Sequence, residues 1–292
     1  MALSVLSLNV NGLRDPTKRG GLLQWLRAVN SSIDVVCLQE THCVSEEECR
    51  SWFLYSGFNF VVSPGSNHSC GCIVLFRPVL DLVSFSCLVP GRSLLCNFSF
   101  HGSSFSVLCV YAPNRNPARD LFLNQLCDTV DPAIPTVVCG DFNTVFDRSL
   151  DRRGSSIDDT SRESTAALVR LFDACCVLDI WRYLHPASSC FTWSRPNGSF
   201  ASRIDMFGCP YTWVSSTSAC DIVPCPFSDH CAVFFNVNVP AVVPPGPGLW
   251  KLNVSVLAED EYVDLITNFW SNWRRRQNSF SSLAEWWDFG KF

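Results

Sequence analysis

The run Ile134-Pro135-Thr136-Val137-Val138-Cys139 leads directly into Gly140-Asp141-Phe142-Asn143. A short β-branched run that ends in glycine and then in polar residues is typical of a buried strand that breaks into a loop. Residues two apart on a strand point the same way, so Asp141 and Asn143 should lie side by side at its carboxyl end. A carboxylate beside an amide can bind a hard cation and orient a phosphate or a water molecule. The same four residues are equally typical of an ordinary β-turn.

Polar side chains stand at the ends of several other predicted strands. The strand at residues 3–10 ends at Asn9 and Asn11, and the strand at 33–38 runs into Glu40. Further polar residues of this kind are Tyr111, Asp205, Asp229 and His230. Each alone is more typical of a cap or a solvated loop, but strand ends on one edge of a sheet sandwich converge in space. Their oxygen ligands favour Mg²⁺, with Mn²⁺ as an alternative, over zinc.

Size and composition indicate a folded globular chain. Its 292 residues can bury one large core or two smaller ones, and 47% are hydrophobic against 17% charged. The formal net charge of −5 neither indicates nor excludes nucleic-acid binding. A local basic rim around an acidic metal centre would be enough to bind a polyanion.

The 17 cysteines do not follow a disulfide or zinc pattern. Residues 1–8 lack a basic n-region and predict a first strand instead of a signal peptide. Cys37, Cys109 and Cys139 lie within predicted strands, where thiols behave as small hydrophobic groups. We therefore expect reduced cysteines in an intracellular protein that is not secreted. No apolar run reaches the roughly 18 residues that span a bilayer, so no membrane partner is expected.

The order of predicted elements indicates an α/β (α+β) fold. Short strands at 58–62, 72–76, 94–100 and 105–110 predict an antiparallel meander, and helices are expected at 18–30, 45–54, 117–127 and 162–176. Runs of consecutive strands argue against a doubly wound sheet. Two mostly antiparallel sheets packed face to face, with helices outside, fit the pattern better.

The composition changes at Pro240–Gly248, which predicts a linker. We therefore expect a first domain at 1–239 and a helical tail at 249–292 that leads to a missing downstream region. The apolar stripe of this tail comprises Tyr262, Leu265, Ile266, Phe269 and Trp273. The alternative is that the helix folds back and caps the sandwich.

Five stretches occur in order and at suitable spacing: Leu8-Asn9-Val10-Asn11-Gly12-Leu13, Leu38-Gln39-Glu40-Thr41-His42, Val110-Tyr111-Ala112-Pro113-Asn114, Gly140-Asp141-Phe142-Asn143 and Ser228-Asp229-His230. Together they resemble the endonuclease/exonuclease/phosphatase superfamily. Phe191-Thr192-Trp193 and Ser202-Arg203-Ile204-Asp205 narrow the resemblance to its apurinic-endonuclease-like branch. Within it, residues 1–238 look most like the endonuclease domain of LINE-type (non-LTR) retrotransposons. Cellular repair enzymes of the branch carry a carboxylate where this chain has Asn11, whereas the retrotransposon enzymes tend to have asparagine.

This resemblance implies a four-layer, DNase I-like sandwich with one phosphodiester-cleaving site. Asp141 would be the general base, Asn143 would position the water or a phosphate oxygen, and His230 would donate to the scissile phosphate. Asp205 would bond to the other ring nitrogen of His230, and Tyr111 and Asn9 would contact phosphate oxygens. The metal would be held by residues from the set Asn11, Glu40, Asp141, Asn143, Asp229 and His230.

The resemblance also implies DNA as the substrate and nuclear action. Candidate DNA contacts are Arg115, Arg148, Arg152, Thr192, Trp193, Ser202, Arg203 and Ser228, although a solvated surface position is about as typical of each arginine. We expect a target-site endonuclease of a retrotransposon polyprotein, with a downstream reverse transcriptase region as partner. The alternatives are a cellular exonuclease III-like DNA repair nuclease and an inactive remnant that only binds nucleic acid.

Overall fold

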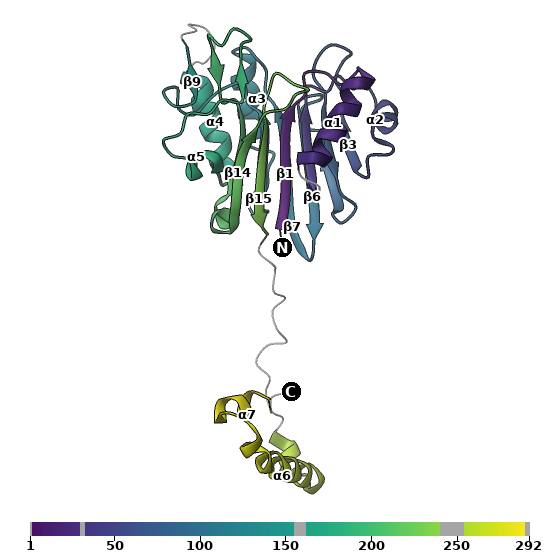
Figure 1. The fold of residues 1–292 in the computed structure, drawn as a ribbon, viewed down its shortest axis with the longest axis vertical. Coiled ribbons are helices and arrows are strands. Elements are labelled where there is room, and N and C mark those ends of the chain that lie inside the picture. Colours follow the sequence, from purple (N-terminus) through teal and green to yellow (C-terminus); the bar gives the residue numbers. More distant parts are fainter. Residues whose placement is uncertain (1, 30–32, 155–161, 240–253, 290–292) are drawn as a thin grey trace. The chain divides into compact units, whose positions relative to one another are not determined.

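A computed structural model describes residues 2–29, 33–154, 162–239 and 254–289 (Figure 1). The chain divides into two compact units, Met1–Val242 and Val243–Phe292. The predicted linker Pro240–Gly248 lies outside the described residues, so the proposed domain boundaries stay a prediction.

The first sheet has the strand order β14-β15-β1-β2-β4-β3. β1 and β2 are parallel neighbours, and the other pairs are antiparallel. Its strands are β1 (Ala2–Asn9), β2 (Val35–Gln39), β3 (Asn59–Ser63), β4 (Cys72–Phe76), β14 (Thr217–Val223) and β15 (Ala232–Asn238).

The second sheet has the order β10-β13-β8-β7-β6-β5, with β7 and β8 parallel and the other pairs antiparallel. Its strands are β5 (Asp81–Ser86), β6 (Ser93–Phe100), β7 (Ser103–Tyr111), β8 (Thr136–Asp141), β10 (Val177–Asp179) and β13 (Asp205–Pro210). A small third sheet joins β11 (Trp193–Ser194), β12 (Ala201–Ser202) and β9 (Arg152–Arg153) in the order β11-β12-β9.

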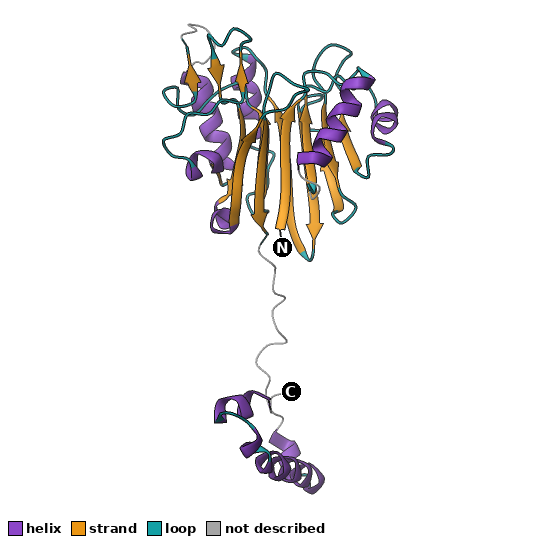
Figure 2. Ribbon diagram, viewed as in Figure 1, coloured by secondary structure: helices purple, strands orange, loops and turns teal. Residues whose placement is uncertain are grey.

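The first unit is a four-layer sandwich, as the sequence predicts (Figures 1 and 2). Helices α1 (Pro16–Val29) and α2 (Glu46–Phe53) flank the first sheet, and α3 (Ala118–Leu126) and α4 (Arg162–Ala174) flank the second. The short helix α5 (Ile180–Leu184) contacts strands of both sheets and buries Ile180 and Trp181 in the core between them. Alternation along the strands explains the layering. On β1, Val5 faces the core between the sheets, while Leu6 packs with Leu22 and Leu26 of α1 on the outer face. On the other side, Leu108 and Val138 pack with residues of α3 and α4.

The prediction of one meander was wrong, because the chain changes sheets within residues 58–110, although β3–β4 and β6–β7 pair antiparallel as expected. β3 and β4 complete the first sheet, whereas β5, β6 and β7 form the edge of the second. The edge strand β5 was missed because most of its side chains are exposed and its pattern carries little hydrophobic signal. Helix α2 begins as predicted: the Ser45 hydroxyl accepts a hydrogen bond from Glu48 N at 3.2 Å.

All 17 cysteines are free thiols, and most are buried. In the described parts of the chain, no helix is both long and apolar enough to cross a bilayer. The second unit contains the 3-10 helix η2 (Val254–Ala258), α6 (Asp260–Arg275), the 3-10 helix η3 (Gln277–Ser279) and α7 (Leu283–Phe289).

Candidate active site

The register of the two sheets brings the predicted site residues to one edge of the sandwich. Asn9 is paired with Gln39, the residue before Glu40, in the parallel β1–β2 ladder, and Tyr111 is paired with Asp141 in the parallel β7–β8 ladder. Asp205 begins β13 directly opposite Asp141. The strand ends open onto a cavity of about 340 Å³. Its lining includes eight of the nine residues expected to act in catalysis or metal binding: Asn9, Asn11, Glu40, Tyr111, Asp141, Asn143, Asp229 and His230.

The backbone at these strand ends is unusual. Asn11, Glu40 and Asn143 have φ values of 45°, 55° and 50°, the left-handed region that non-glycine residues rarely occupy. Three such residues at one cavity are typical of a functional site. Gly140 has φ 141°, and a Cβ there would lie 1.9 Å from the carbonyl oxygen of Val110. Only glycine therefore fits the position that delivers Asp141 to the cavity.

Asp141 is a buried carboxylate, only 1% exposed, held by three donors. Asn9 Nδ2 donates to Oδ2 at 2.9 Å, and the Asn143 backbone N–H donates to Oδ1 at 2.9 Å. The Asn143 side-chain amide adds a longer bond of 3.3 Å. Burial and the negative charge of Asp205 raise the pKa of Asp141 to about 7, although His230 and these donors oppose the rise. A carboxylate with such a pKa can accept a proton near neutral pH.

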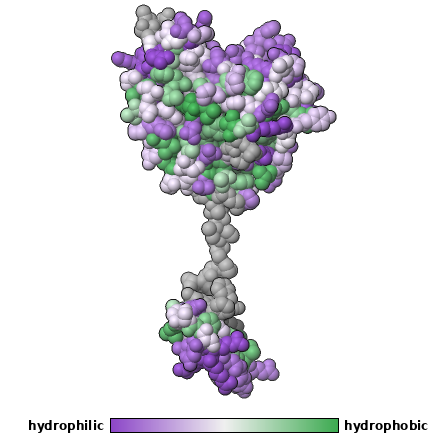
Figure 3. Space-filling model, viewed as in Figure 1, coloured by the Kyte–Doolittle hydropathy of each residue, from purple (hydrophilic) through white to green (hydrophobic). Residues whose placement is uncertain are grey.

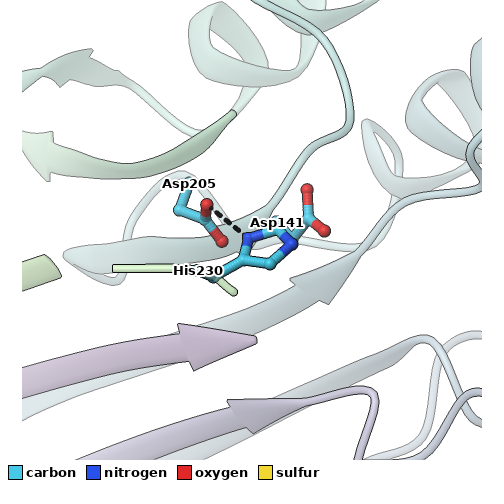
Figure 4. A group of neighbouring side chains, drawn as sticks. All are labelled: Asp141, Asp205 and His230. Carbon is cyan, nitrogen blue, oxygen red and sulfur yellow. Dashed lines mark hydrogen bonds and ion pairs between the residues drawn. The ribbon is translucent and has the colours of Figure 1, made fainter. Parts of the chain in front are cut away.

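His230 and Asp205 form a buried pair beside Asp141 (Figure 4). His230 Nδ1 lies 2.8 Å from Asp205 Oδ2. The Thr192 hydroxyl accepts hydrogen bonds from the N–H groups of Ile204 (3.0 Å) and Asp205 (3.1 Å), which fixes the start of β13. Burial lowers the pKa of His230, but the charge and hydrogen bond of Asp205 outweigh it. The net pKa is raised to about 10, so the ring is an imidazolium at neutral pH.

Glu40 is oriented by Tyr111, whose hydroxyl donates to Oε1 at 2.9 Å. Burial and the charges of Glu40 and Asp141 raise the pKa of Tyr111 well above its ordinary value, so the phenol stays protonated. In this structure the hydroxyl donates its hydrogen bond to Glu40, and the expected contact with a phosphate oxygen stays a prediction.

Asn11 and Asp229 complete the acidic side of the cavity. Asn11 Nδ2 donates to Asp229 Oδ1 at 3.1 Å, and Trp193 Nε1 donates to Oδ2 at 3.0 Å. Burial alone would raise the pKa of Asp229, but these donors and His230 lower it below its ordinary value. Lys18 of α1 stabilises the backbone turn after β1, because its Nζ donates to the carbonyl oxygens of Val10 (2.6 Å) and Asn11 (2.9 Å).

Two groups of side chains offer metal ligands, and their chemistry differs. Ligand atoms of Asp141, Asp205 and His230 lie within 4.8 Å of one another. However, the His230 imidazolium in this group repels a cation. Glu40, Asn11 and Asp229 instead present carboxylate and amide oxygens at the cavity wall, and such oxygens suit Mg²⁺ or Mn²⁺. The residues on the Glu40 side therefore fit a hard cation better.

The expected DNA contacts fall into two groups. Arg115 and Arg148 are exposed, whereas Arg152, Trp193 and Ser202 line the cavity. The expectation for two of the remaining three, Thr192 and Arg203, requires correction, because their side chains are buried inside the fold, whereas Ser228 is half-buried. Thr192 is 1% exposed and fixes β13 as described above. The Ser228 hydroxyl donates to Asn9 O at 2.6 Å and accepts from His230 N at 3.1 Å.

Arg203 is the clearest error, since it is fully buried. Its Nε and Nη2 donate to the two carboxylate oxygens of Asp151 at 2.8 and 3.0 Å. Its Nη1 and Nη2 also donate to Asp179, at 3.2 and 2.5 Å. Arg182 forms a further ion pair with Asp151. A guanidinium enclosed in this way cannot reach a phosphate, so Arg203 holds the loop before β9 against β13.

Sequence reasoning missed four residues of the cavity wall, the polar Asn114 and Arg119 and the apolar Phe200 and Ile204. Arg119 of α3 is 2% exposed, and its Nη1 donates to the carbonyl oxygens of Asn143 (2.7 Å) and Asn114 (3.0 Å). Asn114 Oδ1 accepts from Asn143 Nδ2 at 3.2 Å. Asn114 ends a quoted motif and could have been found there. An arginine in an amphipathic helix carries no such signal.

Comparison with known proteins agrees with this geometry. The chain is 31% identical to the Transposon TX1 uncharacterized 149 kDa protein of Xenopus laevis over its whole length, and it spans 22% of that protein. Solved structures with the same fold include the AP endonuclease LMAP from Leishmania major (TM-score 0.67, 19% identity, 82% of this chain and 88% of that one). An AP endonuclease from Archaeoglobus fulgidus has TM-score 0.68 at 19% identity, covering 81% of this chain and all of the other. The Xenopus laevis APE2 catalytic domain has TM-score 0.66 at 20% identity, covering 80% and 91%.

Residues 6–230 match the Endonuclease/Exonuclease/phosphatase family, a span that contains every strand end of the cavity. The chain therefore belongs to the endonuclease/exonuclease/phosphatase family.

Proposed function

We propose that this protein is a metal-dependent phosphodiester hydrolase that nicks DNA, and that it is the target-site endonuclease of a retrotransposon polyprotein. One observation carries the chemical part of the proposal. A single cavity combines the Asp141 carboxylate, whose pKa is about 7, the His230 imidazolium and several carboxylate and amide oxygens that can bind a hard cation. These are the groups that hydrolysis of a phosphate diester requires.

In the proposed mechanism, a water molecule attacks the phosphorus atom and Asp141 takes its proton. The bond between phosphorus and one sugar oxygen breaks, and that oxygen leaves as a hydroxyl group after it takes a proton from water. Asn9 and the Asn143 N–H hold the carboxylate in place for this transfer. The His230 imidazolium, kept charged by Asp205, donates to the phosphate and stabilises the negative charge that develops there. Glu40, helped by Asn11 and Asp229, would hold the cation, and Tyr111 orients Glu40. When bound, a divalent cation would polarise the phosphate oxygens as a Lewis acid.

Several groups must act together, because no single one is strong enough. Phosphate-ester hydrolysis is so slow that an enzyme removes on the order of 20 kcal/mol from the barrier. One general base contributes about 10²–10⁴-fold, or roughly 3–5 kcal/mol. The remainder falls to electrostatic stabilisation by His230 and the metal side of the cavity.

The retrotransposon assignment is supported by the transposon relative, which aligns over the whole chain, and by Asn11 in place of a carboxylate. The alternative, an apurinic repair nuclease, is supported by the fold alone, because those neighbours are only 19–20% identical. An inactive remnant is disfavoured, because every predicted catalytic position is filled and all the predicted metal ligands line one cavity.

The test is nicking of supercoiled plasmid by the purified chain. We expect open circles in Mg²⁺ or Mn²⁺ and no cleavage in EDTA. Glu40→Gln should abolish nicking, whereas Glu46→Gln, an equivalent change on the exposed face of α2, should not. Full activity after the metal is stripped would refute metal dependence. A strong preference for a duplex with an abasic site over intact DNA would favour the repair alternative.

A further inference from the structure

Helix α6 in the second unit has an apolar face that the described residues of its own unit cover only in part, through ring contacts of α7 with Trp270 and Trp273. None of its residues is buried. Leu265, Ile266, Phe269 and Trp270 are 65%, 48%, 53% and 43% exposed. Figure 3 shows hydrophobic side chains of this unit at its surface beside hydrophilic ones. A helix of this kind has little stability in water unless its apolar face is covered.

The sequence of α6 has a mirror symmetry about the point between Thr267 and Asn268. Reversal about this point exchanges Ile266 with Phe269, and Leu265 with Trp270. It also exchanges Tyr262 with Trp273, both of which are half-buried. The apolar stripe therefore presents the same pattern from either direction.

The charges follow the same symmetry with opposite sign. The helix begins with Glu259, Asp260 and Glu261 and ends with Arg274, Arg275 and Arg276. Reversal exchanges each of these three acidic residues with an arginine, while Asp264 is exchanged with Ser271. Two copies of α6 laid antiparallel would thus place Ile266 against Phe269 in two equivalent layers and an acidic end against a basic end at both sides. A parallel arrangement would bring like charges together.

We propose that the second unit associates with a second copy of itself through antiparallel pairing of α6. The partner is a second copy of the helix because the charge pattern of α6 is self-complementary. In a two-fold symmetric contact the same surface is used on both copies, so it must be complementary to itself in the reversed direction. The spacing of Tyr262, Ile266, Phe269 and Trp273 alternates between four and three residues, as in the seam of two helices packed side by side.

Helix α7 supports this face without closing it. The Trp286 ring is 6% exposed and stacks on Trp273 with ring centroids 6.1 Å apart. Its Nε1 donates to the Trp273 carbonyl oxygen at 3.2 Å. This contact holds the C-terminal end of the stripe, while Ile266 and Phe269 at its centre remain exposed. The contact area of one helix pair is small, so we expect a concentration-dependent dimer.

The test uses the full chain in sedimentation velocity over a wide range of concentration. Wild type should shift from monomer to dimer. One variant carries Glu259→Lys, Asp260→Lys and Glu261→Lys, and a second carries Arg274→Glu, Arg275→Glu and Arg276→Glu. Each alone should associate at least about tenfold more weakly, because like charges now meet, and an equimolar mixture should form mixed dimers. Glu46→Lys with Glu47→Lys, in the first turn of α2, is the matched control and should dimerise like wild type.

Charge reversal at the helix ends also opposes the helix dipole, so circular dichroism must accompany the measurement. Should α6 unwind in these variants, Ile266→Ala with Phe269→Ala keeps a strong helix-forming sequence and removes only the central layers. This variant should be monomeric. A monomeric wild type, or association that neither the charge reversals nor the alanine variant weakens, would overturn the proposal. In that case the apolar face is covered by another part of the protein or by another partner.

Discussion

Replacement of Arg203 by leucine tests whether this residue holds the fold together or binds DNA. In the structure it is fully buried and gives its hydrogen bonds to Asp151 and Asp179. Burial lowers the pKa of the guanidinium, but the two carboxylates outweigh it, so Arg203 stays charged. Arg203→Leu leaves the Asp151–Arg182 ion pair in place and removes the guanidinium from Asp179.

The loss of stability in Arg203→Leu follows from the buried carboxylate of Asp179, which loses its guanidinium partner. The Asp179 side chain is 9% exposed, and loss of one partner of a buried ion pair costs about 3–5 kcal/mol, chiefly because the other charge stays buried. For a unit of this size, 1 kcal/mol corresponds to about 2–4 °C in Tm. We therefore expect Arg203→Leu to lower Tm by about 10 °C.

The assay combines thermal unfolding with a pair of rescue variants. Asp179→Asn in the Arg203→Leu background should restore part of the loss, because it removes the uncompensated charge. Asp151→Asn in the same background should not, because it leaves Arg182 without this carboxylate. Arg203 would instead be a DNA contact if Arg203→Leu raised KM for DNA and left Tm unchanged. Equal effects of the two rescue variants would also contradict the reasoning.

Four further changes test the site and the domain boundary. Asp205→Asn should lower the pKa of His230 towards its ordinary value of about 6.5. The ratio of variant to wild-type rate should then fall by at least about tenfold between about pH 6 and pH 8.5, whereas a constant ratio would exclude a role for the imidazolium. Asp205→Ala and His230→Ala should each cost at least about 10²-fold in kcat, and the double variant little more; strictly multiplicative losses would show independent action. Gly140→Ala should cost more than about 3 kcal/mol in unfolding free energy, because its Cβ meets the Val110 carbonyl oxygen, and a fully stable variant would contradict that contact. Truncation after Val239 should keep the nicking rate and change Tm by only a few degrees; a fall of about 10 °C would show that the tail stabilises the sandwich.

The sequence predicted the strand ends of the site because each one breaks a regular apolar pattern. A strand such as β8 ends in glycine and polar residues, and this change of pattern can be seen in the sequence alone. The order of strands and helices predicted two sheets with helices outside, and the family resemblance implied the four layers. In the structure, alternation along the strands assigns one face of each strand to each core. The meander failed because local pattern does not specify which sheet a strand joins. That choice depends on contacts between residues far apart in the chain.

Burial of polar residues could not be predicted in the same way. Arg203 and Thr192 lie in a stretch that also holds Ser202 and Asp205, and nothing local distinguishes those that face the cavity from those that face the core. Arg119 is a similar case, because its role depends on the carbonyl groups of Asn114 and Asn143, which the fold brings to it. Polar side chains that act through backbone partners become visible only in three dimensions.

The strained strand ends are held by polar side chains that bind their backbone. Left-handed conformations at Asn11, Glu40 and Asn143 cost free energy, and a packed scaffold must hold them. The Lys18 ammonium, the Arg119 guanidinium and the Ser228 hydroxyl bind carbonyl oxygens at these turns. They fix the backbone and leave the side-chain oxygens of the cavity for a ligand. The catalytic groups can therefore be few, because other residues hold the backbone that positions them.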